Sequence, residues 1–165
     1  MAPSEEYRVR VTKDYLVFCA AHFICFENGQ CEYLHGHNYK VGAELTGPLG
    51  AAQMVYDFIL VKKLLRKIVD SLDHRMLVPL KSPMIRVEER GSSVRLSFEK
   101  KEWIFPREDC VLLDMESTTA ELLARWIAGQ LLQELARNSL PPPQRIRIDV
   151  EETFGQTATY ETNGV

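Results

Sequence analysis

The chain has 165 residues and a formal net charge of −3, with 45% hydrophobic and 26% charged residues. This balance is typical of one globular domain with its own core, and it excludes a disordered or fibrous chain. The negative charge disfavours a nucleic-acid binder that relies on neutralising phosphates. No apolar run approaches the ~18 residues of a membrane span, and the first residues resemble no secretory signal, so we expect a cytoplasmic protein with neither a membrane nor a nucleic-acid partner.

Strand-like and helix-like patterns alternate along the chain. Apolar and polar residues alternate, as in half-buried strands, over 7–12, 18–24, 39–46, 146–150 and 157–162. Helical spacing of apolar residues predicts helices over 57–72 and 119–137. Asp57 suits the positive end of the first helix dipole, while Ser117 and Glu121 are placed to cap the second helix. Adjacent strands with segregated helices predict an α+β fold with an antiparallel sheet.

The stretch between the two helices returns to a strand pattern. Apolar residues on either side of a Gly91-Ser92-Ser93 turn predict two strands, and Trp103 and Phe105 suggest a third. We therefore interpret 1–165 as a single domain with an inserted strand region at about 83–106.

The four cysteines are Cys19, Cys25, Cys31 and Cys110. None forms a Cys-x-x-Cys pair, and without a secretory context we expect no disulfide framework. Cys19 and Cys25 lie in an apolar stretch and are interpreted as small buried hydrophobes. Cys31 lies in a polar segment beside a histidine cluster, so it alone has the context of a reactive thiol.

His35-Gly36-His37 is the sharpest local feature. Residues two apart in a strand point to the same face, and Gly36 allows close backbone approach. His22 lies on a neighbouring predicted strand and on an otherwise apolar parity. Three imidazoles with one open position are typical of a catalytic zinc. The competing interpretation is a chance pair of histidines beside a core histidine that is hydrogen-bonded for structural reasons.

Asp73 and His74 follow the first predicted helix. A carboxylate beside an imidazole can fix its tautomer and raise its basicity for acid–base catalysis. Residues adjacent on a helix do not face each other, so the pair can also be a solvated helix end.

Glu152 is informative through its register. It continues the apolar parity of residues 146–150, and a carboxylate on a buried face must bind a cation or N–H donors. The alternative is that the strand ends at Val150 and leaves Glu152 in solvent.

Together these residues resemble a known family. The motifs come in the family's order and are Ala20-Ala21-His22, Cys31-x-x-x-His35-Gly36-His37-Asn38-Tyr39, Met54-Val55-x-Asp57-Phe58, Leu72-Asp73-His74-x-x-Leu77, Thr119-Ala120-Glu121 and Glu152-Thr153. They resemble the 6-pyruvoyl-tetrahydropterin synthase and 6-carboxy-tetrahydropterin synthase family over nearly the whole chain apart from the inserted region. Thr118 departs from the pattern, because the family usually has proline there.

The resemblance implies a tunnelling fold, in which an antiparallel sheet carries two helices on one face and trimers pair into a hexameric barrel. It implies Zn²⁺ on His22, His35 and His37, and active sites at the subunit interfaces. The implied substrate is 7,8-dihydroneopterin triphosphate, a small-molecule pterin triphosphate whose side-chain hydroxyls the zinc would bind.

The resemblance also implies roles for the other motif residues. Cys31 matches the catalytic thiol, and Asp73 with His74 matches the acid–base pair that supports it. Glu152 matches the carboxylate that binds the pterin, and Thr119 is a second substrate-binding candidate. Nothing in the sequence singles out the basic residues that would hold the triphosphate.

The spacing of Cys31 discriminates between members of the family. Cys31 lies four residues before His35, which resembles the bacterial 6-carboxy-tetrahydropterin synthases of queuosine and deazapurine synthesis, carbon–oxygen lyases that release acetaldehyde and triphosphate. Glu32 lies where a folate-pathway subgroup carries a specificity glutamate and forms 6-hydroxymethyl-dihydropterin. The alternatives are therefore a pyruvoyl- or hydroxymethyl-forming enzyme and, in another class, a non-catalytic relative that binds pterin or metal.

Overall fold

The computed structural model describes residues 5–163 and is built from two helices and nine strands. In chain order the elements are β1 (Tyr7–His22), β2 (His35–Gly47), α1 (Phe58–Leu72), β3 (Arg75–Pro79), β4 (Arg86–Arg90), β5 (Ser93–Phe98), β6 (Lys101–Pro106), a 3-10 turn (Arg107–Asp109), β7 (Cys110–Leu113), α2 (Ala120–Arg137), β8 (Arg145–Thr153) and β9 (Gln156–Asn163).

Six strands form the main sheet in the order β7-β3-β1-β2-β8-β9. The pairs β1–β2, β2–β8 and β8–β9 are antiparallel, which confirms the predicted α+β class. The pairs β1–β3 and β3–β7 are parallel, so the sheet is mixed at one edge. The sequence did not predict β3 or β7, because each is a short strand whose pairing is made with a residue far along the chain.

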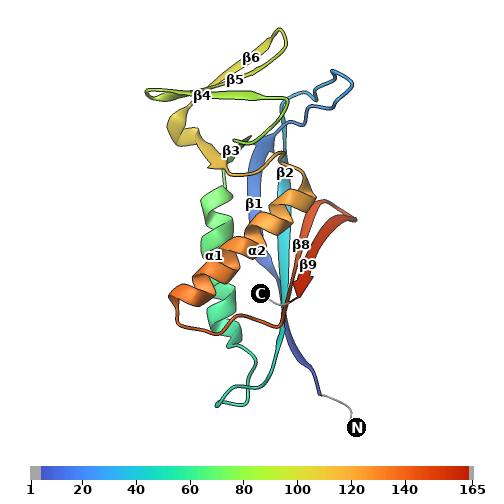
Figure 1. Cartoon of the computed structure of the whole chain (residues 1–165), viewed down its shortest axis with the longest axis vertical. Helices are drawn as coiled ribbons and strands as arrows, with labels where there is room; N and C mark the ends of the chain where they lie inside the picture. The colour runs from blue at the N-terminus through green and yellow to red at the C-terminus, as the bar shows by residue number, and fades with distance from the viewer. Residues whose placement is uncertain (1–4, 164–165) are drawn as a thin grey trace.

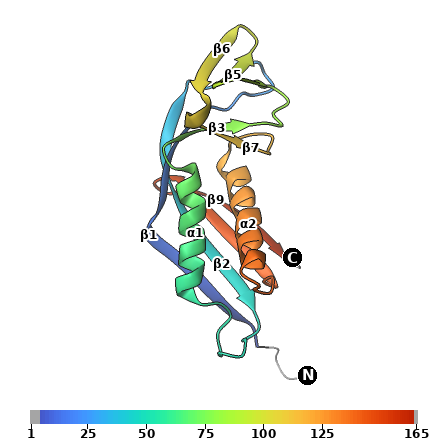
Figure 2. The ribbon, with the colours of Figure 1, turned by 90° about the vertical axis from the view of Figure 1, so that its left-hand side faces the viewer.

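Both helices cover one face of this sheet (Figures 1 and 2). Helix α1 packs against β1, and α2 packs against β8 and β9. The core lies between the layers, where the ring of Phe18 stacks on that of Tyr39 with 4.8 Å between centroids. The buried residues of α1 recur at intervals of three and four, and they are Val61, Leu64, Leu65, Ile68, Val69 and Leu72. Burial of this stripe drives helix formation more than local propensity does.

Side chains cap the first turn of each helix. The Asp57 carboxylate accepts a hydrogen bond from the Ile59 backbone N–H at 2.8 Å, so the predicted start of α1 is confirmed. The Thr119 hydroxyl accepts from the Leu122 N–H at 3.4 Å, which makes Thr119 the N-cap of α2. The expectation that Ser117 caps this helix was wrong, because the N-cap lies two residues later and the helix begins at Ala120.

The inserted region forms a separate three-stranded antiparallel sheet, β4-β5-β6, at one end of the long axis of the molecule (Figure 1). A second hydrophobic cluster joins it to the body, and the Trp103 ring stacks on Phe23 with 4.3 Å between centroids. Within the described residues, neither helix is both long and apolar enough to cross a membrane.

Replacing Leu65 by alanine tests the contact between α1 and the sheet. Leu65 is 0% exposed, and truncating such a side chain removes buried area and leaves a cavity. We expect the free energy of unfolding to fall by about 2–5 kcal/mol in urea titrations. Ile59 on the same helix is 72% exposed, and Ile59→Ala should change stability by no more than about 0.5 kcal/mol. Equal effects of the two substitutions would contradict this packing.

Candidate metal and substrate site

Three histidines meet on the helix-covered face of the main sheet. In the antiparallel register of β1 and β2, His22 lies opposite His35 and Ala20 lies opposite His37. All three imidazoles therefore leave the same face, as their parity predicts. One ligand atom from each lies within 4.8 Å of the others, and the ring centroids are 4.7 to 5.3 Å apart. The histidines are thus close enough to hold one metal ion.

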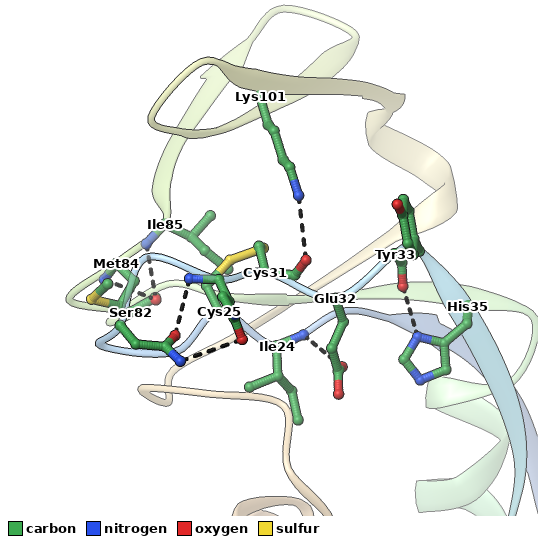
Figure 3. Close-up of a disulfide and its surroundings, with 12 residues drawn as sticks. Ile24, Cys25, Cys31, Glu32, Tyr33, His35, Ser82, Met84, Ile85 and Lys101 are labelled. Atoms are coloured by element: carbon green, nitrogen blue, oxygen red, sulfur yellow. Dashed lines mark hydrogen bonds between the residues drawn. A yellow bond between two sulfur atoms is a disulfide. The ribbon is translucent and has the colours of Figure 1, made fainter.

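Backbone carbonyls orient two of the three rings. Nδ1 of His22 lies 3.1 Å from the carbonyl oxygen of Thr118, just before α2. Nδ1 of His35 lies 2.8 Å from the carbonyl oxygen of Tyr33 (Figure 3). A proton on each Nδ1 satisfies these carbonyls and leaves Nε2 free to bind a metal. Metal-binding histidines commonly donate their second ring N–H to a carbonyl in this way.

Burial favours the neutral form of His22. His22 is 1% exposed, and burial lowers the pKa of its imidazole because the charged form loses solvation. The neutral form is the one that ligates metal. At Gly36, a Cβ atom would lie 3.0 Å from the Ala20 carbonyl oxygen, closer than ordinary contact. Glycine therefore permits the close approach of β2 to β1 between the two histidines.

Tyr39 connects the histidines to Glu152. The Tyr39 hydroxyl lies 3.2 Å from Nε2 of His22 and donates to the Glu152 carboxylate at 3.3 Å. Burial, followed by the charge of Glu152, raises the pKa of Tyr39, so the phenol keeps its proton. Glu152 Oε1 is also 3.6 Å from Nε2 of His22 and 3.9 Å from Nε2 of His37. Strand β8 continues to Thr153, so Glu152 faces the cluster and the solvent-facing alternative was wrong.

A cavity of about 300 Å³ lies beside this network. Glu152 and Thr119, the two predicted substrate-binding residues, both line it. The other lining residues are Ile24, Ala120, Glu121, Gln156, Thr157 and Ala158. Its volume suits a small ligand. The N-terminus of α2 and the β8–β9 hairpin thus bring the two predicted residues to one cavity.

Asp73 and His74 form a pair at the end of α1. Asp73 Oδ2 lies 2.9 Å from His74 Nδ1, and Oδ1 accepts the Cys19 backbone N–H at 2.7 Å. The bond from Cys19 is the main reason that the pKa of Asp73 is lowered, and it fixes the carboxylate beside the imidazole. His74 has φ 55°, and its side chain is 82% exposed. Cys19 lies three residues from His22 along β1, which is about 10 Å at the rise of a strand. The bond to Cys19 therefore ties Asp73 to the strand that carries His22.

Cys31 differs from expectation. It is joined to Cys25 in a disulfide, and both residues pack against the second hydrophobic cluster (Figure 3). The expectation of no disulfide was wrong, and Cys31 is not a free thiol in this structure. The free cysteines among residues 5–163 are Cys19 and Cys110. Cys19 is exposed rather than buried, because it lies on the parity of β1 that faces away from the core.

Glu32 leaves the same loop in another direction. Its carboxylate accepts the Ile24 backbone N–H at 3.0 Å (Figure 3). Its negative charge also contributes to the raised pKa of Tyr39, although less than burial and Glu152 do. Glu32 is half-buried, and the side chain on which its charge acts is Tyr39. Glu32 is therefore held in place by the backbone and is not a fully solvated loop residue.

Sequence reasoning missed two members of the site, Tyr39 and Thr118, and one disulfide. Tyr39 shares the parity of His35 and His37, so the same two-residue period could have identified it. Thr118 contributes a backbone carbonyl, which any residue provides and no sequence pattern reveals. The pairing of Cys25 with Cys31 depends on a tight hairpin, and the Asn28-Gly29 turn between them is the signal that could have found it.

Comparison with known proteins identifies relatives of the chain. A family model described as 6-pyruvoyl tetrahydropterin synthase matches residues 10–163. A protein from Methanocaldococcus jannaschii, named putative 6-carboxy-5,6,7,8-tetrahydropterin synthase, is 34% identical over 146 residues, which cover 88% of this chain and 89% of that protein. The 6-carboxy-5,6,7,8-tetrahydropterin synthase of Haemophilus influenzae is 31% identical over 74% of this chain and 81% of its own length.

Solved structures show the same fold. The crystal structure of Plasmodium vivax 6-pyruvoyl tetrahydropterin synthase superposes with a TM-score of 0.89 at 30% identity, covering 97% of this chain and 99% of that one. A second structure of the Plasmodium protein carries alanine in place of a glutamate described as a catalytic residue. The resemblance confirms the tunnelling fold, with two helices on a mostly antiparallel sheet.

Metal content tests the histidine cluster. We expect the protein to retain a divalent metal after dialysis, and the His35→Ala variant to lose it, because two imidazoles hold an ion far less tightly than three. His74→Ala is the matched control, since His74 lies outside the cluster. Elemental analysis and circular dichroism of both variants would separate metal loss from unfolding. Unchanged metal in a folded His35→Ala protein would refute the site.

Proposed function

Since the chain belongs to the 6-pyruvoyl tetrahydropterin synthase family, we propose that it is a zinc-dependent carbon–oxygen lyase that converts 7,8-dihydroneopterin triphosphate to 6-carboxy-5,6,7,8-tetrahydropterin. The observation that carries this proposal is the juxtaposition of three convergent histidines with a cavity lined by Glu152 and Thr119. The names of the archaeal and bacterial relatives support the carboxy product. The reaction would serve queuosine or deazapurine synthesis.

His22, His35 and His37 would hold the metal. Three neutral nitrogen ligands and an open position are the donor set of a catalytic zinc, and two of the rings already present Nε2 through their carbonyl contacts. A bound zinc ion supplies Lewis-acid polarisation of a substrate oxygen, which makes neighbouring C–H bonds more acidic.

Glu152 would anchor the pterin. A carboxylate accepts hydrogen bonds from an amino-pyrimidine edge, which presents adjacent N–H donors. The bond from the Tyr39 hydroxyl orients the Glu152 carboxylate at the boundary between cavity and histidines. Thr119 lines the same cavity as the N-cap of α2. The ligand would thus be held with its side chain toward the histidines.

Cys31, Asp73 and His74 would move protons. Asp73 holds His74 through Nδ1, which leaves Nε2 to give or take a proton. A thiolate at Cys31 would remove a proton from the substrate side chain while triphosphate leaves. The exposure of His74 fits an active site completed by a neighbouring subunit, so we propose a homohexamer built as a dimer of trimers.

Glu32 favours one second candidate, a lyase that forms 6-hydroxymethyl-dihydropterin. Its carboxylate is held beside Ile24 and acts on Tyr39, so it can serve as an acid–base group near the histidines. The Plasmodium structure with a substituted catalytic glutamate gives the family a precedent for a catalytic carboxylate. No comparable contact favours a 6-pyruvoyl product or a non-catalytic binding role among the described residues.

Product analysis tests the proposed function. The zinc-loaded protein, kept reduced, should convert the triphosphate to the carboxy product with release of acetaldehyde, identified by mass spectrometry. Cys31→Ser should lower this turnover by roughly a hundredfold or more, the usual contribution of a positioned acid–base group. Glu32→Gln is the comparison variant and should leave the carboxy product dominant.

Three results would point elsewhere. Release of glycolaldehyde that disappears in Glu32→Gln would establish the hydroxymethyl reaction instead. A pyruvoyl product without carbon–carbon cleavage would establish the pyruvoyl reaction. Unchanged substrate bound to a folded, metal-containing protein would establish a binding role.

A further inference from the structure

Cys25 and Cys31 face each other across a small antiparallel hairpin. The Phe26 N–H donates to the Gln30 carbonyl at 2.7 Å, and the Glu32 N–H donates to the Ile24 carbonyl at 2.9 Å. These bonds flank an antiparallel bridge between Cys25 and Cys31, whose Cα atoms are 4.0 Å apart. Side chains are closest at such a non-hydrogen-bonded position. The backbone hydrogen bonds of the hairpin therefore place Cys25 and Cys31 directly opposite each other.

The bond changes the chemistry of Cys31. A disulfide sulfur has no proton to give and no lone-pair basicity comparable to a thiolate, so it cannot act as an acid–base group. We propose that the Cys25–Cys31 disulfide is a reversible switch that disables the lyase when oxidised and restores it when reduced. The inference rests on the proposed role of Cys31. The lyase activity would then be high when the surrounding dithiols are reduced and low when they are oxidised.

Cys25 is the sulfur through which reduction would begin. It lines a cavity of about 220 Å³ together with residues of the segment that joins β3 to β4. A thiolate of a dithiol reductant attacks Sγ of Cys25, the S–S bond breaks, and Cys31 leaves as the thiolate. The second thiol of the reductant then displaces Cys25, which gives two protein thiols and one oxidised reductant. The dithiol is the only co-reactant that this exchange needs.

The release of Cys31 also frees its side chain. In the oxidised state Cys31 packs against the second hydrophobic cluster. Cys31 is not among the described residues that line the cavity with Glu152 and Thr119. After reduction the Cys31 side chain can turn away from that cluster without carrying Cys25 along. Glu32 is not part of the bond, so its hydrogen bond to Ile24 does not need the disulfide.

The other two cysteines do not share these features. Cys110 is buried in the second hydrophobic cluster, and burial raises the pKa of its thiol, which slows exchange. Cys19 is exposed on β1 and has no cysteine opposite it, since its partner in the register is Asn38. Within the described chain, the geometry restricts a reversible intramolecular bond to Cys25 and Cys31.

Differential thiol labelling tests the bond without relying on activity. The full-length protein is equilibrated with oxidised or reduced dithiothreitol, alkylated, digested and analysed by mass spectrometry. We expect Cys25 and Cys31 to be blocked together after oxidation and alkylated together after reduction. Cys19 should be alkylated in both states. Free Cys25 and Cys31 under oxidising conditions would overturn the proposal.

Turnover of the zinc-loaded protein is measured in the same two states. We expect the oxidised protein to be slower by roughly a hundredfold or more, the loss expected when an acid–base group is removed. Cys25→Ser cannot form the bond, so it should be active in both states. Cys19→Ser is the matched control, and it should keep the full dependence on the reductant.

The outcomes separate this inference from the proposed function. If the bond cycles and turnover is the same in both states, the switch is overturned and the lyase stands with another acid–base group. If the bond cycles and turnover is absent in both states, the proposed function fails and the switch fails with it. A Cys25→Ser variant that still responds to oxidation would also overturn the switch.

Discussion

The antiparallel register between β1 and β2 is the constraint on which the candidate site depends. It sets His22 opposite His35 and Ala20 opposite His37, so that three imidazoles leave one face of two adjacent strands. A slip of one residue would turn one strand's histidines toward the other face of the sheet. The stack of Phe18 on Tyr39 lies in the same register and belongs to the main core. The packing that stabilises the sheet therefore also fixes the metal ligands.

A second requirement is that this polar cluster is satisfied inside an apolar layer. Unpaired polar groups at such depth are costly, and here two of them, His22 and Tyr39, have partners from other elements. The start of α2 supplies the Thr118 carbonyl to His22, and β8 supplies Glu152 to Tyr39. The cluster thus ties helix and sheet together. Because a ligand that binds only the folded state stabilises it, metal binding would strengthen the whole domain.

Much of this could be predicted from residue periods. The two-residue period gave the shared face of His22, His35 and His37, and the helical period gave α1 and α2 to within a residue or two. Pairings made through space were missed. Strands β3 and β7 are short and depend on parallel partners. The Cys25–Cys31 bond depends on a hairpin whose Asn28-Gly29 turn, with Gly29 at φ 78°, is a recognisable signal that the sequence analysis did not use. The cap at Thr119 was misplaced because several residues there can accept a hydrogen bond.

The inserted sheet reaches the loop that carries Cys31 and Glu32. Lys101 at the start of β6 donates to the Cys31 carbonyl at 3.3 Å, and Trp103 stacks on Phe23, the residue after His22 (Figure 3 shows the lysine). Indole emission depends on what touches the ring. The second tryptophan, Trp126, lies far along the chain on α2 and packs against the main core. The fluorescence of Trp103 should therefore report on the contact between the inserted sheet and Phe23, which follows the end of β1.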